Sequence, residues 1–281
     1  TGPDAAVYFA RPATGPPGPG GPPTLECFAF RSGDRGRTWE AVPTRVSNPH
    51  GGGIHRDAHP LVQFSDGTLM GVMTMAMTPE RDSAGMPGGV GVFGSDDNGL
   101  TWEYVAEVAR DPTGVGRPTY AGLLLLPGGR LQCYMLNIGG VRNAIQLAYS
   151  DDGGASWSDA RPIVAWGQSP WVARRPPQEA RSGVHYRSPW PMRLRDGRIV
   201  VLFARRKPPS GIGLIVSEDE GATWSAETIV RDDGSGSDLG YPVATQLDDG
   251  RIFTAYYFME DDGNGFGGTR HIAGSFFRLA G

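Results

Sequence analysis

Short apolar runs separated by polar turns recur along this 281-residue chain. In four places one apolar run leads through a glycine-containing turn into a second run, as residues 61–64 and 69–72 do on either side of Gly67. The four turns are residues 65–68, 127–130, 195–198 and 248–251. A turn with glycine between two apolar runs is a strong local signal for a β-hairpin. The pattern therefore predicts four antiparallel hairpins.

An eight-residue pattern, Ser-x-Asp-x-Gly-x-(Thr or Ser)-Trp, is in phase with these hairpins. It occupies residues 32–39, 95–102, 150–157 and 217–224, and the last three copies each follow a third apolar run. Its Asp and hydroxyl side chains can bond the backbone of a turn, its Gly supplies a positive φ, and its Trp can pack between neighbouring repeats. Another apolar run, such as residues 102–108, comes next. Four antiparallel strands per repeat predict the blades of a β-propeller, with structural Asp residues.

Five repeats can be counted, and the first and last are incomplete. The second to fifth begin near His59, Tyr120, Tyr186 and Tyr241. The first lacks a hairpin turn and an innermost strand, and the last lacks a fourth strand. Because open sheet edges favour aggregation, we expect residues upstream of Thr1 to complete the ring. We predict one all-β domain over residues 1–281, a five- or six-bladed propeller with an incomplete N-terminal blade.

Composition limits the partners and the location. The formal net charge of −4 argues against nucleic acid as a main partner. No apolar stretch is long enough to span a membrane, and the residues given contain no signal peptide. Cys27 and Cys133 fall on strands of different repeats, so we expect free thiols. A secreted or periplasmic location would fit a glycan-acting protein, and the oligomeric state is left open.

Long, chemically varied loops are expected on one face of the ring, opposite the short hairpin turns. They include residues 47–60, 110–121, 166–190, 205–211 and 232–242, and all five histidines fall on this face. Irregular loops on a rigid scaffold are common places for binding sites. We therefore expect the site at this face of the ring.

The candidate site residues are His, Arg, Tyr and Asp side chains of these loops. As catalytic groups we select Tyr241, Asp57, His55 and His185, and as substrate-binding groups Arg56, Tyr120, Arg142, Arg187 and Arg205. Several guanidinium groups at one mouth would suit a carboxylate or a sulfate. The alternative is that many of them only cap strands. The spacing of the histidines in residues 47–60 matches no standard metal site, so neither a metal nor a cofactor is expected.

The repeated pattern and its four-stranded repeat resemble the sialidase superfamily, in which the motif is called the Asp-box or BNR repeat. The resemblance covers about residues 5–279. It implies a Tyr nucleophile activated by a Glu, a separate Asp as acid/base, and three Arg that hold the substrate carboxylate. Tyr241 falls at the nucleophile position, and Arg142 and Arg205 at the second and third arginines.

Three departures from that pattern affect the expected mechanism. Tyr257 stands where the family has a Glu that steadies the first arginine. Residues 11–24 contain no acid, and the activating Glu expected near Tyr120 is missing. An unassisted Tyr, with a pKa of ~10, is a poor nucleophile at neutral pH.

Three functions are therefore open, and all three concern an acidic carbohydrate or glycoconjugate. The first and favoured one is a sialidase-like exo-glycosidase on a terminal acidic sugar, with Tyr241 near the anomeric carbon and Asp57 as replacement acid/base. The second is a polysaccharide lyase on uronate-containing glycans, in which Tyr, His and Arg supply acid, base and anion clamp. The third is a glycan-binding propeller without catalysis. The fold alone does not choose among them.

Overall fold

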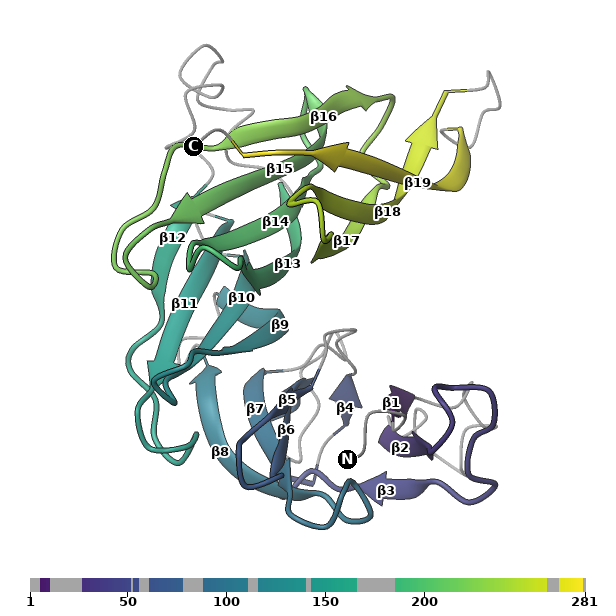
Figure 1. Cartoon of the computed structure of the whole chain (residues 1–281), viewed down its shortest axis with the longest axis vertical. Coiled ribbons are helices and arrows are strands. Elements are labelled where there is room, and N and C mark those ends of the chain that lie inside the picture. The colour runs from purple at the N-terminus through teal and green to yellow at the C-terminus, as the bar shows by residue number, and fades with distance from the viewer. Residues whose placement is uncertain are drawn as a thin grey trace. The chain divides into compact units, whose positions relative to one another are not determined.

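The structure is a computed structural model, and it describes residues 6–10, 27–51, 53–55, 61–77, 88–110, 116–139, 143–165, 185–261 and 268–279. Within these ranges the regular elements are β-strands and none is a helix (Figure 1). The strands form antiparallel sheets that follow one another along the chain. The predicted all-β propeller class, with four-stranded antiparallel blades, is confirmed.

The first two sheets contain the N-terminal strands. The first has the order β1-β2-β3, with bounds Ala6–Ala10, Cys27–Ser32 and Thr44–Val46. The second has the order β4-β6-β7-β8, and β5 also pairs with β6. Their bounds are Ile54–His55 for β4, Val62–Gln63 for β5, Leu69–Met75 for β6, Gly89–Ser95 for β7 and Glu103–Arg110 for β8.

The remaining sheets follow in chain order. The third has the order β12-β11-β10-β9, from β9 (Gly116–Leu125), β10 (Leu131–Gly139), β11 (Ala144–Ser150) and β12 (Arg161–Ala165). The fourth runs β13-β14-β15-β16, from β13 (Tyr186–Arg193), β14 (Ile199–Arg205), β15 (Ser210–Ser217) and β16 (Thr228–Gly234). The fifth is β17-β18-β19, from β17 (Gly240–Gln246), β18 (Ile252–Glu260) and β19 (Thr269–Phe277).

The four predicted hairpin turns are present at the expected residues. In each, the glycine amide donates to the carbonyl three residues earlier, as Gly197 N does to Leu194 O at 3.0 Å. Each of these glycines has a φ between +83° and +96°, which L-residues with a Cβ rarely adopt. The glycine therefore lets the chain reverse tightly at this edge of the sheets.

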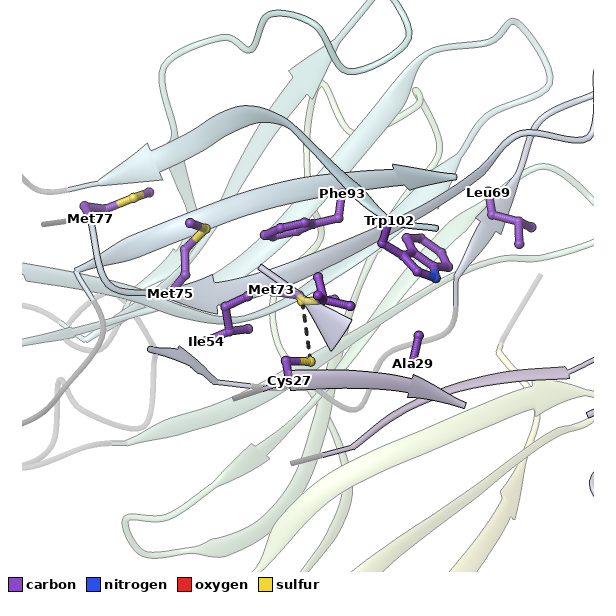
Figure 2. Packing of buried hydrophobic residues seen from close by; sticks show 10 residues of the cluster. Cys27, Ala29, Ile54, Leu69, Met73, Met75, Met77, Phe93 and Trp102 are labelled. Atoms are coloured by element: carbon purple, nitrogen blue, oxygen red, sulfur yellow. Dashed lines mark hydrogen bonds between the residues drawn. The ribbon is translucent and has the colours of Figure 1, made fainter. Parts of the chain in front are cut away.

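The chain divides into two compact units, residues 1–133 with 148–160, and residues 134–147 with 161–281. In the first unit, Cys27 and Ala29 of β2 pack with Met73, Phe93 and Trp102 (Figure 2). In the second unit, side chains of the fourth and fifth sheets share a core. That core includes Leu194, Val200, Leu202, Leu214 and Ile252, and next to them Ala204, Ile212, Leu239, Tyr256 and Phe258. Burying one such aliphatic or aromatic side chain stabilises the fold by about 1.5–3 kcal/mol.

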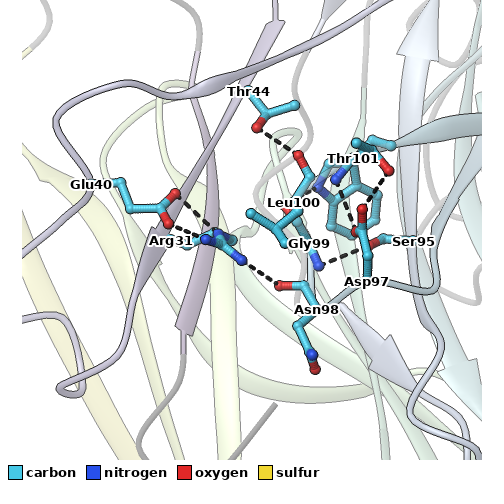
Figure 3. Close-up of polar contacts among 10 residues, drawn as sticks. Arg31, Glu40, Thr44, Ser95, Asp97, Asn98, Gly99, Leu100 and Thr101 are labelled. Atoms are coloured by element: carbon cyan, nitrogen blue, oxygen red, sulfur yellow. Dashed lines mark hydrogen bonds and ion pairs between the residues drawn. The ribbon is translucent and has the colours of Figure 1, made fainter.

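The Asp-boxes form the same hydrogen-bonded turn four times, as the copy with Asp97 shows in Figure 3. Ser95 Oγ accepts from Gly99 N at 2.7 Å and donates to Asp97 Oδ1 at 2.8 Å. Thr101 donates its amide to Asp97 Oδ1 at 2.9 Å and its hydroxyl to Oδ2 at 2.6 Å, and Trp102 Nε1 donates to Gly99 O. The carboxylate therefore satisfies backbone and hydroxyl donors of its own turn, as expected for a structural residue.

The Asp-box between β7 and β8 also accepts hydrogen bonds from side chains of the first sheet. Arg31 of β2 forms an ion pair with Glu40 and donates to Asn98 O at 3.4 Å, and Thr44 Oγ1 donates to Leu100 O at 2.7 Å (Figure 3). Both acceptors are backbone carbonyls of the box. The turn thus offers its neighbour hydrogen-bond acceptors at fixed positions.

The Asp-box carboxylates predict how the protein responds to acid. Hydrogen bonds from the Thr or Ser of the same box lower the pKa of Asp34, Asp97, Asp152 and Asp219 to about 2. In the unfolded chain an Asp has a pKa of ~3.9. Their contribution to the free energy of unfolding is therefore fully present above this unfolded value and is lost as the pH falls through about 2. We expect the thermal midpoint to fall in this window by calorimetry.

The matched variants are Asp97→Asn and Asp159→Asn, the second at an exposed position outside the boxes. Asp97→Asn should flatten the acid slope and lower the midpoint at neutral pH, whereas Asp159→Asn should leave both unchanged. An acid slope identical in the two variants would contradict the role of the box.

Candidate functional site

Several candidate residues of the second unit lie at one edge of its sheets, opposite the hairpin turns. At this edge β13 and β17 begin and β14 and β18 end. Because neighbouring strands are antiparallel, residues far apart in the sequence meet here. Arg187 follows the start of β13, Arg206 follows β14, and Tyr241 lies in β17.

Tyr241 lies in a β-bulge that exposes its side chain. The pairing of β17 with β18 shifts between Gly240 and Val243, and Tyr241 has a φ of +51°. Its side chain is 39% exposed. Tyr120 of β9 and Ser188 of β13 have φ values of +51° and +41° in corresponding inner strands. A residue with positive φ near the start of the inner strand therefore recurs in three sheets, and in β13 and β17 it accompanies a register shift.

Gly240 brings two sheets close together beside Tyr241. Its φ is +142°, and a Cβ there would meet Ala204 Cβ at 2.8 Å and Arg187 Cβ at 3.8 Å. A larger residue would push the fifth sheet from the fourth. Glycine thus places Tyr241 next to the backbone that carries Arg187.

Tyr257 of β18 connects the aromatic and charged groups of the cluster. Its ring stacks on that of Tyr241, with centroids 5.7 Å apart and an interplanar angle of 29°. Its hydroxyl donates to Asp238 Oδ1 at 2.8 Å and accepts from the guanidinium of Arg206. Arg270 Nε donates to Asp238 Oδ2 at 2.5 Å, and Arg206 Nε donates to Leu239 O at 3.0 Å. We call Arg187, Arg206, Asp238, Tyr241, Tyr257 and Arg270 the Tyr241 cluster.

The charges of this cluster follow from these contacts. Burial and the hydrogen bond to Asp238 raise the pKa of Tyr257 to about 12, so its phenol is neutral at physiological pH. Hydrogen bonds from Arg270 and Tyr257 lower the pKa of Asp238, so that carboxylate is charged. Arg206 and Arg270 thus lie near the carboxylate of Asp238, and the charge of Arg187 acts on Tyr257, so the cluster carries net positive charge.

Arg205 does not belong to this cluster, contrary to the expected substrate contact. Its side chain is 0% exposed, and Nε lies 2.5 Å from Oε1 of the buried Glu227. Nη1 donates to Pro209 O at 2.6 Å, and Tyr186 donates its hydroxyl to Glu227 Oε2 at 3.4 Å. Successive residues of a strand face opposite sides, so Arg205 turns into the fourth sheet and Arg206 points to Tyr257. This placement assigns Arg205 a structural role and makes Arg206 the accessible arginine.

His185 is also placed unfavourably for the expected proton transfer. Its ring is fully buried against Tyr186, with centroids 4.4 Å apart, and Nδ1 accepts from Lys207 N at 3.2 Å. Burial, with the charges of Arg205 and Lys207, lowers the pKa of His185 to about 2. A buried imidazole held neutral in this way supports the entry to β13, where Asn143 Oδ1 accepts from two backbone amides.

Of the remaining expected residues, two lie in the first unit and three lie outside the described residues. Tyr120 belongs to the first unit, where its amide donates to Thr74 Oγ1 at 3.1 Å. The backbone of His55 lies in β4 opposite Thr74. Arg56, Asp57 and Arg142 lie outside the described residues.

The structure adds four residues that the sequence did not single out as site residues. Arg206 lies within the expected loop 205–211, and Asp238 lies within the expected loop 232–242. Tyr257 was noted as a departure from the family pattern, whereas Arg270 gave no signal. In the described parts of the chain, no group of three or more His, Cys, Asp or Glu side chains is arranged to hold a metal ion. Within the same residues, no helix is long and apolar enough to cross a membrane.

A family model described as the BNR repeat-like domain matches residues 17–254. The chain belongs to this family. The predicted membership of the sialidase-like BNR superfamily is confirmed. Comparison with curated proteins finds no match.

Solved structures similar to this BNR repeat protein include three of different origin. A protein of unknown function from Dyadobacter fermentans is 25% identical, with a TM-score of 0.69, covering 91% of this chain and 65% of that one. An α-L-arabinanase from Penicillium chrysogenum, complexed with arabinobiose, is 19% identical, with a TM-score of 0.56 and coverage of 77% and 60%. The NanB sialidase from Streptococcus pneumoniae is 17% identical, with a TM-score of 0.62 and coverage of 90% and 36%. Each of these proteins is longer than the part matched, and the last two show similarity of fold alone.

Replacing one partner of the buried ion pair between Arg205 and Glu227 should lower the free energy of unfolding. Glu227→Gln leaves a buried guanidinium without its counter-charge and should lower the free energy of unfolding by about 3–5 kcal/mol. The double variant Arg205→Met with Glu227→Leu should recover most of this loss. Urea unfolding measures both, and a single variant as stable as the parent would contradict the structural role.

His185 is predicted to stay neutral wherever the protein is folded. Its ring signals in NMR spectra should not titrate between about pH 4 and 8, because the folded pKa is lowered to about 2. The variant His185→Gln assigns those signals by their loss. A titration of His185 near the ordinary histidine pKa of about 6.5 would show that the ring reaches solvent and would restore it as a proton-transfer group.

Proposed function

We propose that this chain is a carbohydrate-active propeller domain that acts as an exo-glycosidase on a terminal acidic sugar. The observation that carries the proposal is the exposed Tyr241, which lies in one cluster with Arg187, Arg206 and Arg270 in the second unit. Guanidinium groups match carboxylates in geometry and charge. The glycosidases among the similar folds support a carbohydrate ligand. One propeller domain over residues 1–281 remains part of this proposal.

In this mechanism the arginines bind the carboxylate of the sugar and orient its anomeric carbon toward Tyr241. The phenol of Tyr241 loses its proton, and its oxygen forms a bond to the anomeric carbon as the glycosidic bond breaks. The leaving oxygen takes up a proton in the same step, which balances the proton that Tyr241 gives up. Water then hydrolyses the tyrosyl–sugar bond: its hydroxyl goes to the anomeric carbon, and its proton returns to the phenol oxygen of Tyr241. Tyr257 stays protonated and does not compete as a nucleophile.

A uronate lyase is the second candidate, and the same arginine cluster would bind its substrate carboxylate. It needs a base beside that carboxylate, and the burial of His185 weakens the histidine proposed for it. A glycan-binding propeller is the third candidate. Its support is that Tyr257 takes the place at which the resemblance expects a Glu.

One assay of the full chain distinguishes the three candidate functions. It uses a panel of glycans that bear terminal sialic or uronic acid. A reducing sugar released without unsaturated product indicates hydrolysis. The ultraviolet absorbance of an unsaturated uronate indicates elimination. Binding measured by calorimetry without turnover indicates a lectin-like role, and neither binding nor turnover across the panel would contradict the proposal.

Replacement of Tyr241 tests the nucleophile. Tyr241→Phe keeps the ring that stacks on Tyr257 but removes the attacking oxygen, so kcat should fall by about three or more orders of magnitude. The matched control is Tyr149→Phe, because Tyr149 is also 39% exposed but lies in the first unit over Arg130. Equal loss in both variants, or full activity in Tyr241→Phe, would remove Tyr241 from the mechanism.

A further inference from the structure

We propose that Asp238 is a positioning residue, which holds Tyr257 and thereby sets the place of the Tyr241 ring. The functional consequence rests on the proposed role of Tyr241. The structural part does not depend on it, because the ring positions can be measured without a substrate.

Asp238 joins three segments that are distant in the sequence. It precedes β17, Tyr257 lies in β18, and Arg270 lies in β19. Its Oδ1 accepts from the Tyr257 hydroxyl at 2.8 Å and lies 3.8 Å from Arg206 Nη2. Its Oδ2 accepts from Arg270 Nε at 2.5 Å. Both carboxylate oxygens are therefore used, and each binds a different strand.

The direction of the hydrogen bonds fixes the Tyr257 hydroxyl. Asp238, as a charged carboxylate, can only accept, so Tyr257 must donate to it. The oxygen of Tyr257 then accepts from Arg206, which also donates to Leu239 O at 3.0 Å. The ring of Tyr257 is thus held from its far end by a fixed donor and a fixed acceptor. The ring of Tyr241 stacks on this held surface.

The backbone between Asp238 and Tyr241 is also held in place by packing. Leu239 is fully buried in the core with Ala204 and Phe258, and Gly240 lies against Ala204. The main chain is therefore held at residues 239 and 240, and the side chain of Asp238 holds the segment on its other side. Asp238 itself is 45% exposed, so its replacement removes ligands of the cluster without opening the core.

Asp238 differs from three other aspartates of the second unit that pair with arginine, whereas Asp248, like Asp238, contacts an arginine far away in the sequence, Arg195. Asp196, Asp233 and Asp249 each accept from an arginine two residues away in the sequence, as Arg231 Nε does with Asp233 at 2.6 Å. Such a pair joins groups of one short segment only. The pair of Asp238 and Arg270 spans 32 residues and includes a tyrosine hydroxyl. Asp233→Asn is therefore a matched control, since it breaks an arginine–aspartate pair outside the Tyr241 cluster.

The test compares Asp238→Asn and Asp233→Asn in the full chain, with tyrosines labelled with ¹³C for NMR. Tyr241→Phe and Tyr257→Phe assign the two rings. In Asp238→Asn we expect the ring signals of both tyrosines to shift, because the stacked geometry is released. We also expect the phenol of Tyr257 to ionise at lower pH than its parent value of about 12, because the neighbouring negative charge is gone and Arg206 remains. Asp233→Asn should change neither.

Unchanged Tyr241 signals in Asp238→Asn, or an unchanged Tyr257 titration, would overturn the proposal whether or not a substrate is known. Where the parent turns over a glycan, Asp238→Asn should lower kcat by about 10- to 100-fold with little change in KM, since a misplaced reacting group affects the chemical step. Full kcat with shifted rings would overturn the positioning role. A parent without glycan binding or turnover would contradict the proposed function alone, because the ring signals still decide the role of Asp238.

Discussion

The side-chain hydrogen bonds of the Asp-box are the interaction on which the order of this structure depends. In each copy one carboxylate accepts from the amide and the hydroxyl of the residue four positions later, and the serine hydroxyl accepts from the glycine amide. These bonds satisfy donors that a reversal between two strands would otherwise leave to water. The turn has the same hydrogen-bond geometry each time and joins the last two strands of its sheet. The loops at the opposite edge do not contain this repeated pattern and differ in sequence.

At that opposite edge, successive side chains of one strand point to opposite faces, so that one polar group is buried and the next is not. Arg205 and Arg206 are neighbours in the sequence but differ completely in environment. The first is enclosed with Glu227 and anchors the segment that follows β14. The second reaches Tyr257 and Leu239. A buried ion pair contributes little net stability, because desolvation offsets most of the attraction. Its value here is geometric, since it holds the chain that presents Arg206.

The Tyr241 cluster, which we propose as a site for a charged sugar, combines three features. An exposed phenol projects from a bulge with positive φ, a second phenol is held neutral beneath it, and arginines surround a single carboxylate. Strained backbone and shifted pKa values often mark functional sites. Here a residue with positive φ recurs in three inner strands, so the strain belongs to the scaffold. The chemistry is specified by the side chain that each bulge carries.

The sequence by itself determined the strands, their antiparallel hairpins and the Asp-box turns, because these depend on period-two hydrophobicity and on glycine at positive φ, which are local properties. It also offered Tyr241 and Arg187 as candidate site residues, which stay predictions. The tertiary structure decided which of two adjacent arginines faces the cluster, that His185 is buried, and that Asp238 and Arg270 bind Tyr257. These facts depend on how two sheets meet at Gly240 and on strand register across 32 residues. No local sequence pattern specifies a contact between residues 32 positions apart. The register of the strands also matters, because a shift of one residue would have exchanged the environments of Arg205 and Arg206.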